Sequence, residues 1–438
     1  MKNKMKSKIK KLSAAVLFIS IILTGCLKGG DVVKYENGLR AVLLHNEDSL
    51  VSSINVFINV GSVNETPSQA GLSHFIEHLM FKGSKNYQGD LFSRNVENMG
   101  GYINAATSKE YTVYYVNIQK NGVEESIKML ADAMENPMFP QDEIDRERKV
   151  VIEEIQRHLD NPMSMLYEKF FETIYLQSEL KNSVIGTAEV IGNISRDEIY
   201  SYYSSHYIPQ KMTVVISGNF DKQKVRKLLD ETFKNFQSKE IPPVPNLIEP
   251  PSKGRNIVLK ENVEVSYLIG GFLGPVIDSD DIFAADLAMA VLGGGKSSRL
   301  NRVLKEEKRL VYSISSSFYT LKGTGVFFIS AVFDEKNLQS IKEEIHKQIK
   351  DIIDNGITKE ELDRAKVISK TDWAFGHETP SEIAQNVGYW TLVGRPEVAK
   401  NYLERIASLN VDDIKEVLRK YYVEDNYSSV ALTPKGQK

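Results

Sequence analysis

The sequence predicts an α+β protein made of two homologous halves, each with helices packed on a mostly antiparallel sheet. Three observations indicate this: 438 residues exceed what one hydrophobic core usually organises, a proline-rich stretch lies near the middle, and blocks of the first half recur in order in the second. The balance of 42% hydrophobic and 26% charged residues is typical of globular proteins.

Residues 1–25 are predicted to be a signal peptide of the lipoprotein type. Six lysines precede an apolar run over 12–23, which has the order of a secretory signal and is short for a transmembrane helix. Leu23-Thr24-Gly25-Cys26 resembles the bacterial lipobox, whose cysteine is diacylated and becomes the mature N-terminus. We therefore expect a lipid on Cys26, a tether over 26–33, and a lipid-anchored location on the extracytoplasmic side of a bacterial cell membrane. A plain signal peptide or a short anchor helix is the alternative.

Net charge and cysteine content restrict the function further. The formal charge is −3, and the predicted mature chain loses six lysines and no acidic residue, which gives −9. This charge does not favour a nucleic-acid partner. Cys26 is the only cysteine, so no internal disulfide can form.

The boundary between the halves is predicted from proline content. Five of the 14 prolines fall within 241–251, a composition that disfavours both helix and central strand. We expect a first domain over 34–240, a linker over 241–256 and a second domain over 257–438.

The two domains are predicted to be copies of one unit. Segment 197–218 matches 412–433 at an offset of 215, and in both an amphipathic helix leads through a polar turn into a β-branched strand. Upstream, EIDR at 143–146 matches ELDR at 361–364 at an offset of 218. The opening strand, turn and helix of the first half also have a counterpart. An ordered series of matches indicates duplication.

A metal site is predicted in the first copy. His74, Glu77 and His78 form H-x-x-E-H, and on a helix residues i and i+4 share one face, so that both imidazoles can bind one ion. Two neutral imidazoles and a carboxylate suit zinc, and the fourth position is left for water. The apolar residues around the motif predict a largely buried helix. Burying ionisable side chains there costs free energy, which a functional role would explain.

The third protein ligand is not fixed by spacing alone. Glu147 and Glu154 lie two helical turns apart on one face of the helix predicted over 142–158, whereas Glu153 points elsewhere. Taken singly, a glutamate in so charged a helix is more commonly a surface charge.

Several of these segments together resemble the insulinase (pitrilysin) metallopeptidases, in particular the single-unit type that includes mitochondrial processing peptidase and bacterial homologues. The match covers nearly all of the mature chain; besides the H-x-x-E-H helix it comprises 100–115, 147–155, 217–221 and 293–316. The resemblance implies Glu154 as the third ligand and Glu147 as a supporting residue. It also implies the insulinase fold, with two homologous halves forming one jaw of a two-jawed chamber.

The resemblance further implies how a substrate is held. Family enzymes bind a peptide as an added strand beside an N-A-x-T-S motif, which here gives Asn104 and Ala105; a turn residue is the alternative for Asn104. An arginine and a tyrosine of the second half stabilise the oxyanion in the family. Tyr312 matches the tyrosine, but Lys305 stands where the family has arginine and lacks its planar fork.

The sequence therefore predicts a zinc-dependent endopeptidase with one Zn²⁺ per chain and Glu77 as the general base. The second copy lacks the metal set, since it has no histidine pair near 284–290 and carries Asp372 where the first has Glu154. Expected partners are peptide substrates and a second jaw, either a second copy or a related subunit. The alternative is a non-catalytic or weakly active partner subunit, or a peptide-binding lipoprotein, of the same fold.

Overall fold

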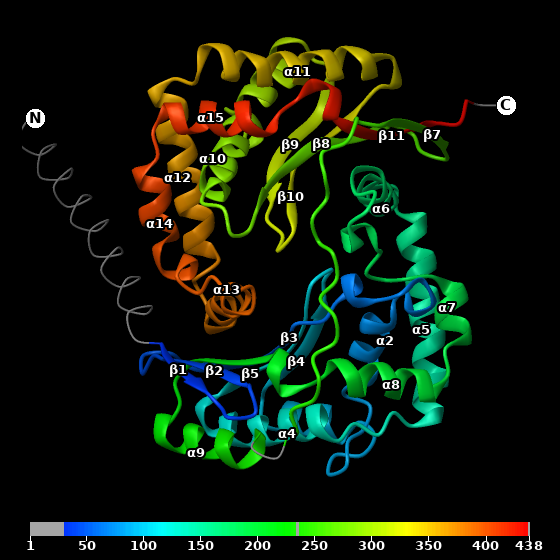
Figure 1. The fold of residues 1–438 in the computed structure, drawn as a ribbon, viewed down its shortest axis with the longest axis vertical. Coiled ribbons are helices and arrows are strands. Elements are labelled where there is room, and N and C mark those ends of the chain that lie inside the picture. Colours follow the sequence, from blue (N-terminus) through cyan, green and yellow to red (C-terminus); the bar gives the residue numbers. More distant parts are fainter. Residues whose placement is uncertain (1–29, 234–235, 437–438) are drawn as a thin grey trace, which may run out of the picture.

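Two sheets, one from each half of the chain, form the framework of the protein (Figure 1). The computed structural model describes residues 30–233 and 236–436, so Cys26 and the predicted signal peptide lie outside the described residues. Within those ranges, no helix is both long enough and apolar enough to cross a membrane.

The first sheet has the order β1-β2-β6-β3-β5-β4. Its pairs are antiparallel except for β2 with β6, which run parallel. Its strands are β1 (Asp31–Lys34), β2 (Arg40–His45), β3 (Val51–Ile58), β4 (Tyr102–Thr107), β5 (Thr112–Gln119) and β6 (Met212–Gly218). The helices of this half are α2 (Leu72–Leu79), α3 (Leu91–Asn98), α4 (Val123–Glu135), α5 (Gln141–Asp160), α6 (Pro162–Ile174), α7 (Ala188–Asn193), α8 (Arg196–His206) and α9 (Lys222–Phe233).

The second sheet repeats this arrangement without the first strand. Its order is β7-β11-β8-β10-β9, and only β7 and β11 run parallel. The strands are β7 (Asn256–Glu261), β8 (Ser266–Val276), β9 (Val311–Tyr319), β10 (Thr324–Phe333) and β11 (Ser428–Pro434). The helices are α10 (Asp281–Gly293), a π-helical segment (Asn301–Glu307), α11 (Leu338–Asn355), α12 (Lys359–Phe375), α13 (Pro380–Leu392), α14 (Val398–Ser408) and α15 (Val411–Tyr421). The shared order confirms the predicted pair of homologous α+β halves.

Each half lends one helix to the sheet of the other, which the sequence did not lead us to expect. α6 packs on β8 and β11, whereas α13 packs on β3 and β6 (Figure 1). Gly388 of α13 lies so close to the Phe57 ring that a side chain there would collide with it. Because helices cover both faces of the first sheet, β3 and β6 are buried almost throughout.

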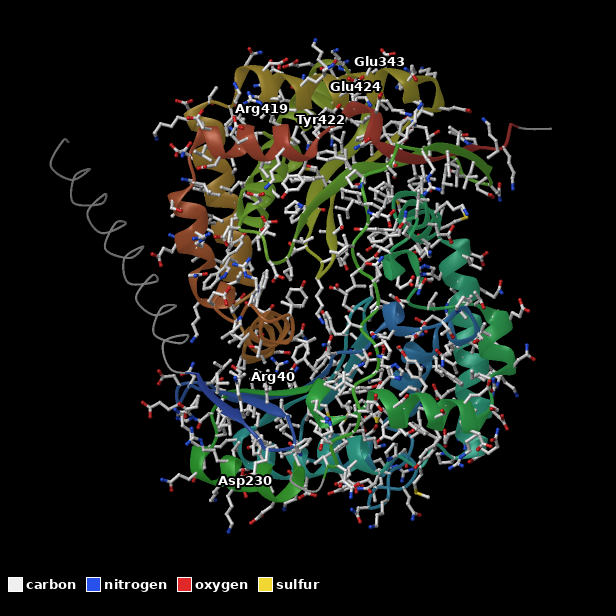
Figure 2. All side chains as sticks on the ribbon, in the orientation of Figure 1. Arg40, Asp230, Glu343, Arg419, Tyr422 and Glu424 are labelled. Carbon is white, nitrogen blue, oxygen red and sulfur yellow. The ribbon has the colours of Figure 1, made fainter. Side chains whose placement is uncertain are left out.

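Polar contacts join the halves at the same places. The Arg40 guanidinium on β2 donates to the Thr391 carbonyl at the end of α13 over 3.2 Å, and Figure 2 shows Arg40 beneath that helix. The irregular segment 236–255 runs between the sheets (Figure 1). Its buried Glu249 carboxylate accepts from the amides of Gln177 and Ser178 over 2.9 and 2.8 Å.

The starts of the two sheets differ by a few residues from the segment boundaries predicted from the sequence. β1 begins at Asp31, so three residues assigned to the tether belong to the first sheet. β7 begins at Asn256, the last residue of the predicted linker.

Candidate metal centre

The H-x-x-E-H residues lie on α2, an eight-residue helix whose apolar face is buried in the first core. Glycine is required at the start of this helix: Gly71 has a φ of +90°, and a Cβ there would collide with the Ile185 carbonyl oxygen. The Glu65 carboxylate accepts from the amides of Gly71 and Ser73, each over 2.7 Å. Because a helix N-terminus leaves amides unpaired, Glu65 fixes the position of the helix that carries the histidines.

The structure brings His74, His78 and Glu154 together. Their ligand atoms lie within 4.8 Å of one another, and no other group of three histidine, cysteine or acidic residues of this kind occurs in the described ranges. Glu154 Oε2 lies 3.9 Å from His74 Nε2 and 3.5 Å from His78 Nε2. Donors about 2.1 Å from a tetrahedral Zn²⁺ lie about 3.4 Å apart. The three donors therefore fit zinc in number, type and spacing, and α5 supplies the third one across from α2.

Protonation of the two imidazoles differs because their surroundings differ. Burial, together with the neighbouring His78 and His158, lowers the pKa of His74 to about 4, which leaves a neutral imidazole able to bind a metal. Burial by itself would lower the pKa of His78, but the hydrogen bond that His78 donates to Glu147, together with the surrounding carboxylates, outweighs burial and raises the pKa.

Glu147 contacts the nitrogen of His78 that faces away from Glu154. Its carboxylate lies 3.1 Å from His78 Nδ1 and 2.6 Å from Lys82 Nζ, so the Nε2 atom of His78 is the one that faces Glu154. A carboxylate on the far nitrogen of a ligand histidine fixes the orientation of the ring and increases its basicity. The Lys82 and His78 hydrogen bonds hold the pKa of Glu147 below its ordinary value in spite of burial.

Glu77 is held beside the cluster by the strand that the sequence associated with substrate. The Thr107 hydroxyl, at the end of β4, donates to Glu77 Oε2 over 2.6 Å. Burial raises the pKa of Glu77, and the Thr107 hydrogen bond opposes that shift. A raised pKa makes a carboxylate a stronger base, and the Thr107 hydrogen bond fixes the position of the group that would take up a proton.

β4 is the edge strand of the first sheet and pairs only with β5 within the described residues. Ala105 packs against the core, whereas Asn104 is exposed. Asn104 Oδ1 accepts from the Ala105 amide over 2.8 Å, and its own amide group donates to the Tyr102 hydroxyl. The free edge of β4 therefore lies next to the cluster of His74, His78 and Glu154. The Asn104 side chain is hydrogen-bonded to the Ala105 amide on this strand.

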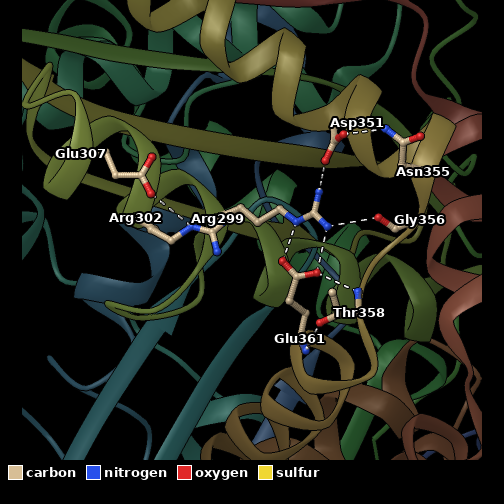
Figure 3. A network of polar contacts seen from close by, with 8 residues as sticks. All are labelled: Arg299, Arg302, Glu307, Asp351, Asn355, Gly356, Thr358 and Glu361. Atoms are coloured by element: carbon tan, nitrogen blue, oxygen red, sulfur yellow. Dashed lines mark hydrogen bonds and ion pairs between the residues drawn. The ribbon is translucent and has the colours of Figure 1, made fainter.

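Lys305 and Tyr312 are not part of this cluster in the same chain. Both belong to the second half, on the π-helical segment and on β9, and both are exposed. The Tyr312 hydroxyl donates to Asp334 over 2.7 Å. The chain just before the π-helical segment is held by Arg299, which binds Glu361 and Asp351 (Figure 3).

Comparison with known proteins places the chain in a family. Residues 40–188 match the insulinase (peptidase family M16) profile, and 193–368 match the profile of the peptidase M16 inactive domain. The chain is 30% identical over 410 residues to the zinc protease PqqE of Helicobacter pylori, which covers 92% of each protein. This chain belongs to the insulinase family.

Other proteins that are similar to this chain agree with the family assignment. The chain is 27% identical over 402 residues to an uncharacterized zinc protease of Bacillus subtilis, and the match covers 92% of this chain and 97% of the relative. The crystal structure of a protease from Helicobacter pylori superposes with a TM-score of 0.87 at 29% identity, over 93% of this chain and 99% of that one. A peptidase M16 inactive domain from Pseudomonas fluorescens, at 16% identity, shares the fold with a TM-score of 0.85 over 94% of this chain and 99% of that one.

Sequence reasoning missed Glu65 and Thr107. Glu65 lies six residues before Gly71, and an acidic residue shortly before a buried helix is a weak signal of capping. Thr107 lay within the N-A-x-T-S motif, but only the fold shows that it reaches Glu77.

Proposed function

We propose that this chain is a zinc-dependent endopeptidase that hydrolyses peptides or unfolded segments, with one Zn²⁺ per chain held by His74, His78 and Glu154. The observation that carries the proposal is the position of Glu77, which lies beside the three donors and is held by the end of an exposed strand edge. Zinc in such a site polarises a carbonyl group and acidifies water.

The roles of the protein groups follow from their contacts. Glu77 takes the proton from the attacking water and delivers it to the leaving amine. Thr107 keeps Glu77 Oε2 in place, and Glu147 orients His78. A peptide pairs with the free edge of β4 through its main chain, displacing the Asn104 side chain from the Ala105 amide, so the preference for particular substrate side chains is expected to be loose.

Peptide cleavage by the purified mature chain tests the activity. We expect hydrolysis of a quenched peptide, loss of hydrolysis in chelator and recovery with added Zn²⁺. Glu77→Gln should keep the metal and lose cleavage by about 100-fold or more, since it removes the base and no ligand. Zinc-loaded chain without cleavage would favour the alternative, a non-catalytic partner subunit of the same fold.

We further propose that the active assembly contains two jaws, as a homodimer or as a heterodimer with a related subunit. Exposed Lys305 and Tyr312 lie outside the metal cluster of their own chain, which supports a role at the site of a partner. A closed pair with twofold symmetry is the commonest way to share such a site.

Mixing two variants tests this arrangement. Glu77→Gln and Tyr312→Phe should each be nearly inactive, but in a mixed dimer one site receives both changes and the other neither. Random mixing makes about half of the dimers mixed, so about a quarter of wild-type sites should be restored. Mixed dimers that show no recovery would refute the shared site.

Lipid attachment at Cys26 and location on the extracytoplasmic side of a bacterial cell membrane are part of the same proposal. They rest on the basic n-region, the short apolar run and the lipobox-like Leu23-Thr24-Gly25-Cys26. A substrate for this enzyme would then be a peptide outside the cytoplasm.

A further inference from the structure

A cavity of about 340 Å³ lies in the second half, at the place that the duplication assigns to the lost metal centre. Asp286, Met289 and Ala290 line it from α10 and repeat the i, i+3, i+4 spacing of His74, Glu77 and His78 at an offset of 212. Asp372 lines it from α12, 218 residues after Glu154, which is the offset at which ELDR repeats EIDR. α10 also lies against α12, as α2 lies against α5.

The walls of this cavity carry acidic side chains and no basic side chain. Of its fourteen lining residues, Asp286 and Asp372 are acidic and none is lysine, arginine or histidine. The Tyr402 hydroxyl donates to Asp286 Oδ2 over 3.0 Å and is the one donor that the described residues give this carboxylate. Burial raises the pKa of Asp286 to about 7, as expected for a carboxyl group that lacks a cation.

The remaining walls suit an organic cation better than a metal ion. Trp373, Trp390 and Tyr402 line the cavity, and aromatic side chains together with carboxylates are the usual surroundings of a bound ammonium or guanidinium group. Asn386 also lines the cavity and adds a polar amide group beside the aromatic walls. Among the residues that the structure describes, no histidine completes a set of three metal ligands with Asp286 and Asp372.

We propose that the duplicate of the metal centre has become a binding pocket for an ammonium or guanidinium group, held by Asp286 and Asp372 between the aromatic walls. A volume of about 340 Å³ is at the lower end of the range for small-molecule pockets and admits one extended alkylammonium chain. The group is supplied either by a basic side chain of a peptide or by a free amine. This inference does not depend on peptidase activity.

The two tryptophans of the chain provide a direct probe, because Trp373 and Trp390 both line the cavity. The experiment titrates the mature full-length chain with N-acetyl-lysine amide, cadaverine and the neutral N-acetyl-norleucine amide while tryptophan fluorescence is recorded. We expect a saturable change with a cationic compound and none with the neutral one. A response to the lysine amide alone indicates a peptide side chain as the source, and a response to cadaverine as well indicates any alkylammonium.

Three variants locate the binding. Asp286→Asn and Asp372→Asn should each weaken it by about tenfold or more, since each removes a charged acceptor. Asp372 is exposed and its replacement leaves the core intact, so a folding defect in Asp286→Asn does not block the test. Asp363→Asn is the matched control on α12, because Asp363 pairs with Lys359 outside the cavity and should leave binding unchanged.

The opposite results would overturn the proposal. These are an equal response to the neutral amide, binding unchanged in both Asp286→Asn and Asp372→Asn, no response to either cation, or binding that disappears with chelator. The last result would place the ligand at the metal centre of the first half instead.

Discussion

Replacing Arg299 should destabilise the second half far more than replacing its neighbour Arg302. The Arg299 side chain is 8% exposed; its Nε and Nη2 atoms bind Glu361 over 2.7 and 2.8 Å, and its Nη1 atom binds Asp351 over 2.7 Å (Figure 3). Glu361 is 10% exposed, so Arg299→Met leaves a buried carboxylate without its cation. Breaking a buried pair in this way costs about 3–5 kcal/mol.

Arg302 is the control on the same segment. It pairs with Glu307 over 3.7 Å, but the two side chains are 59% and 58% exposed, so Arg302→Met should change stability by about 1 kcal/mol or less. Urea unfolding followed by tryptophan fluorescence reports the second half, which holds both tryptophans. Similar shifts in the two variants would show that burial does not set the strength of the Arg299 network.

Three further predictions concern other sites. Cys26→Ser should move the protein out of the membrane fraction and remove the lipid from its intact mass; unchanged fractionation and mass would rule out the anchor. Glu147→Gln should weaken zinc retention by about 10–100-fold in a chelator competition, because His78 loses its orienting carboxylate; full retention would contradict that role. In the ligand-free chain the pKa of Asp286 is raised to about 7 from an ordinary 3.8, so between about pH 4 and 7 this group keeps its proton when folded but ionises when unfolded. Asp286 alone should therefore lower the free energy of unfolding of the ligand-free chain by up to about 4 kcal/mol between pH 4 and 7. Buried Glu65, with a pKa also raised to about 7, contributes in the same direction, so Asp286→Asn should make the fall smaller without removing it; an equal fall in wild type and variant would show that Asp286 does not contribute.

The sequence predicted the features that depend on local pattern. The H-x-x-E-H spacing places two imidazoles on one helix face wherever the helix lies, and the repeated blocks imply repeated structure. Glu147 and Glu154 share a face of α5 for the same reason, although the choice of Glu154 as ligand came from resemblance to the family.

What the sequence did not predict depends on contacts between distant segments. α6 and α13 are amphipathic helices that each begin with a proline. Nothing in the periodicity of their sequences indicates that each one covers the sheet of the other half. Glu65 caps α2 only because a turn brings it back to Gly71. The cavity around Asp286 needs α10, α12, α13, α14 and β9 together, so it has no signature in any one of them.

Metal content tests the proposed zinc site directly, because the proposed function depends on three donors from two helices. Wild type, Glu77→Gln, Glu154→Gln and Glu153→Gln would each be dialysed against a weak chelator and analysed for zinc. We expect about one zinc per chain in wild type and Glu77→Gln, and loss of zinc in Glu154→Gln. Glu153→Gln, one residue away with a side chain 74% exposed, should retain zinc fully. Equal retention by Glu154→Gln and Glu153→Gln, or equal loss by Glu77→Gln and Glu154→Gln, would contradict the assigned ligands.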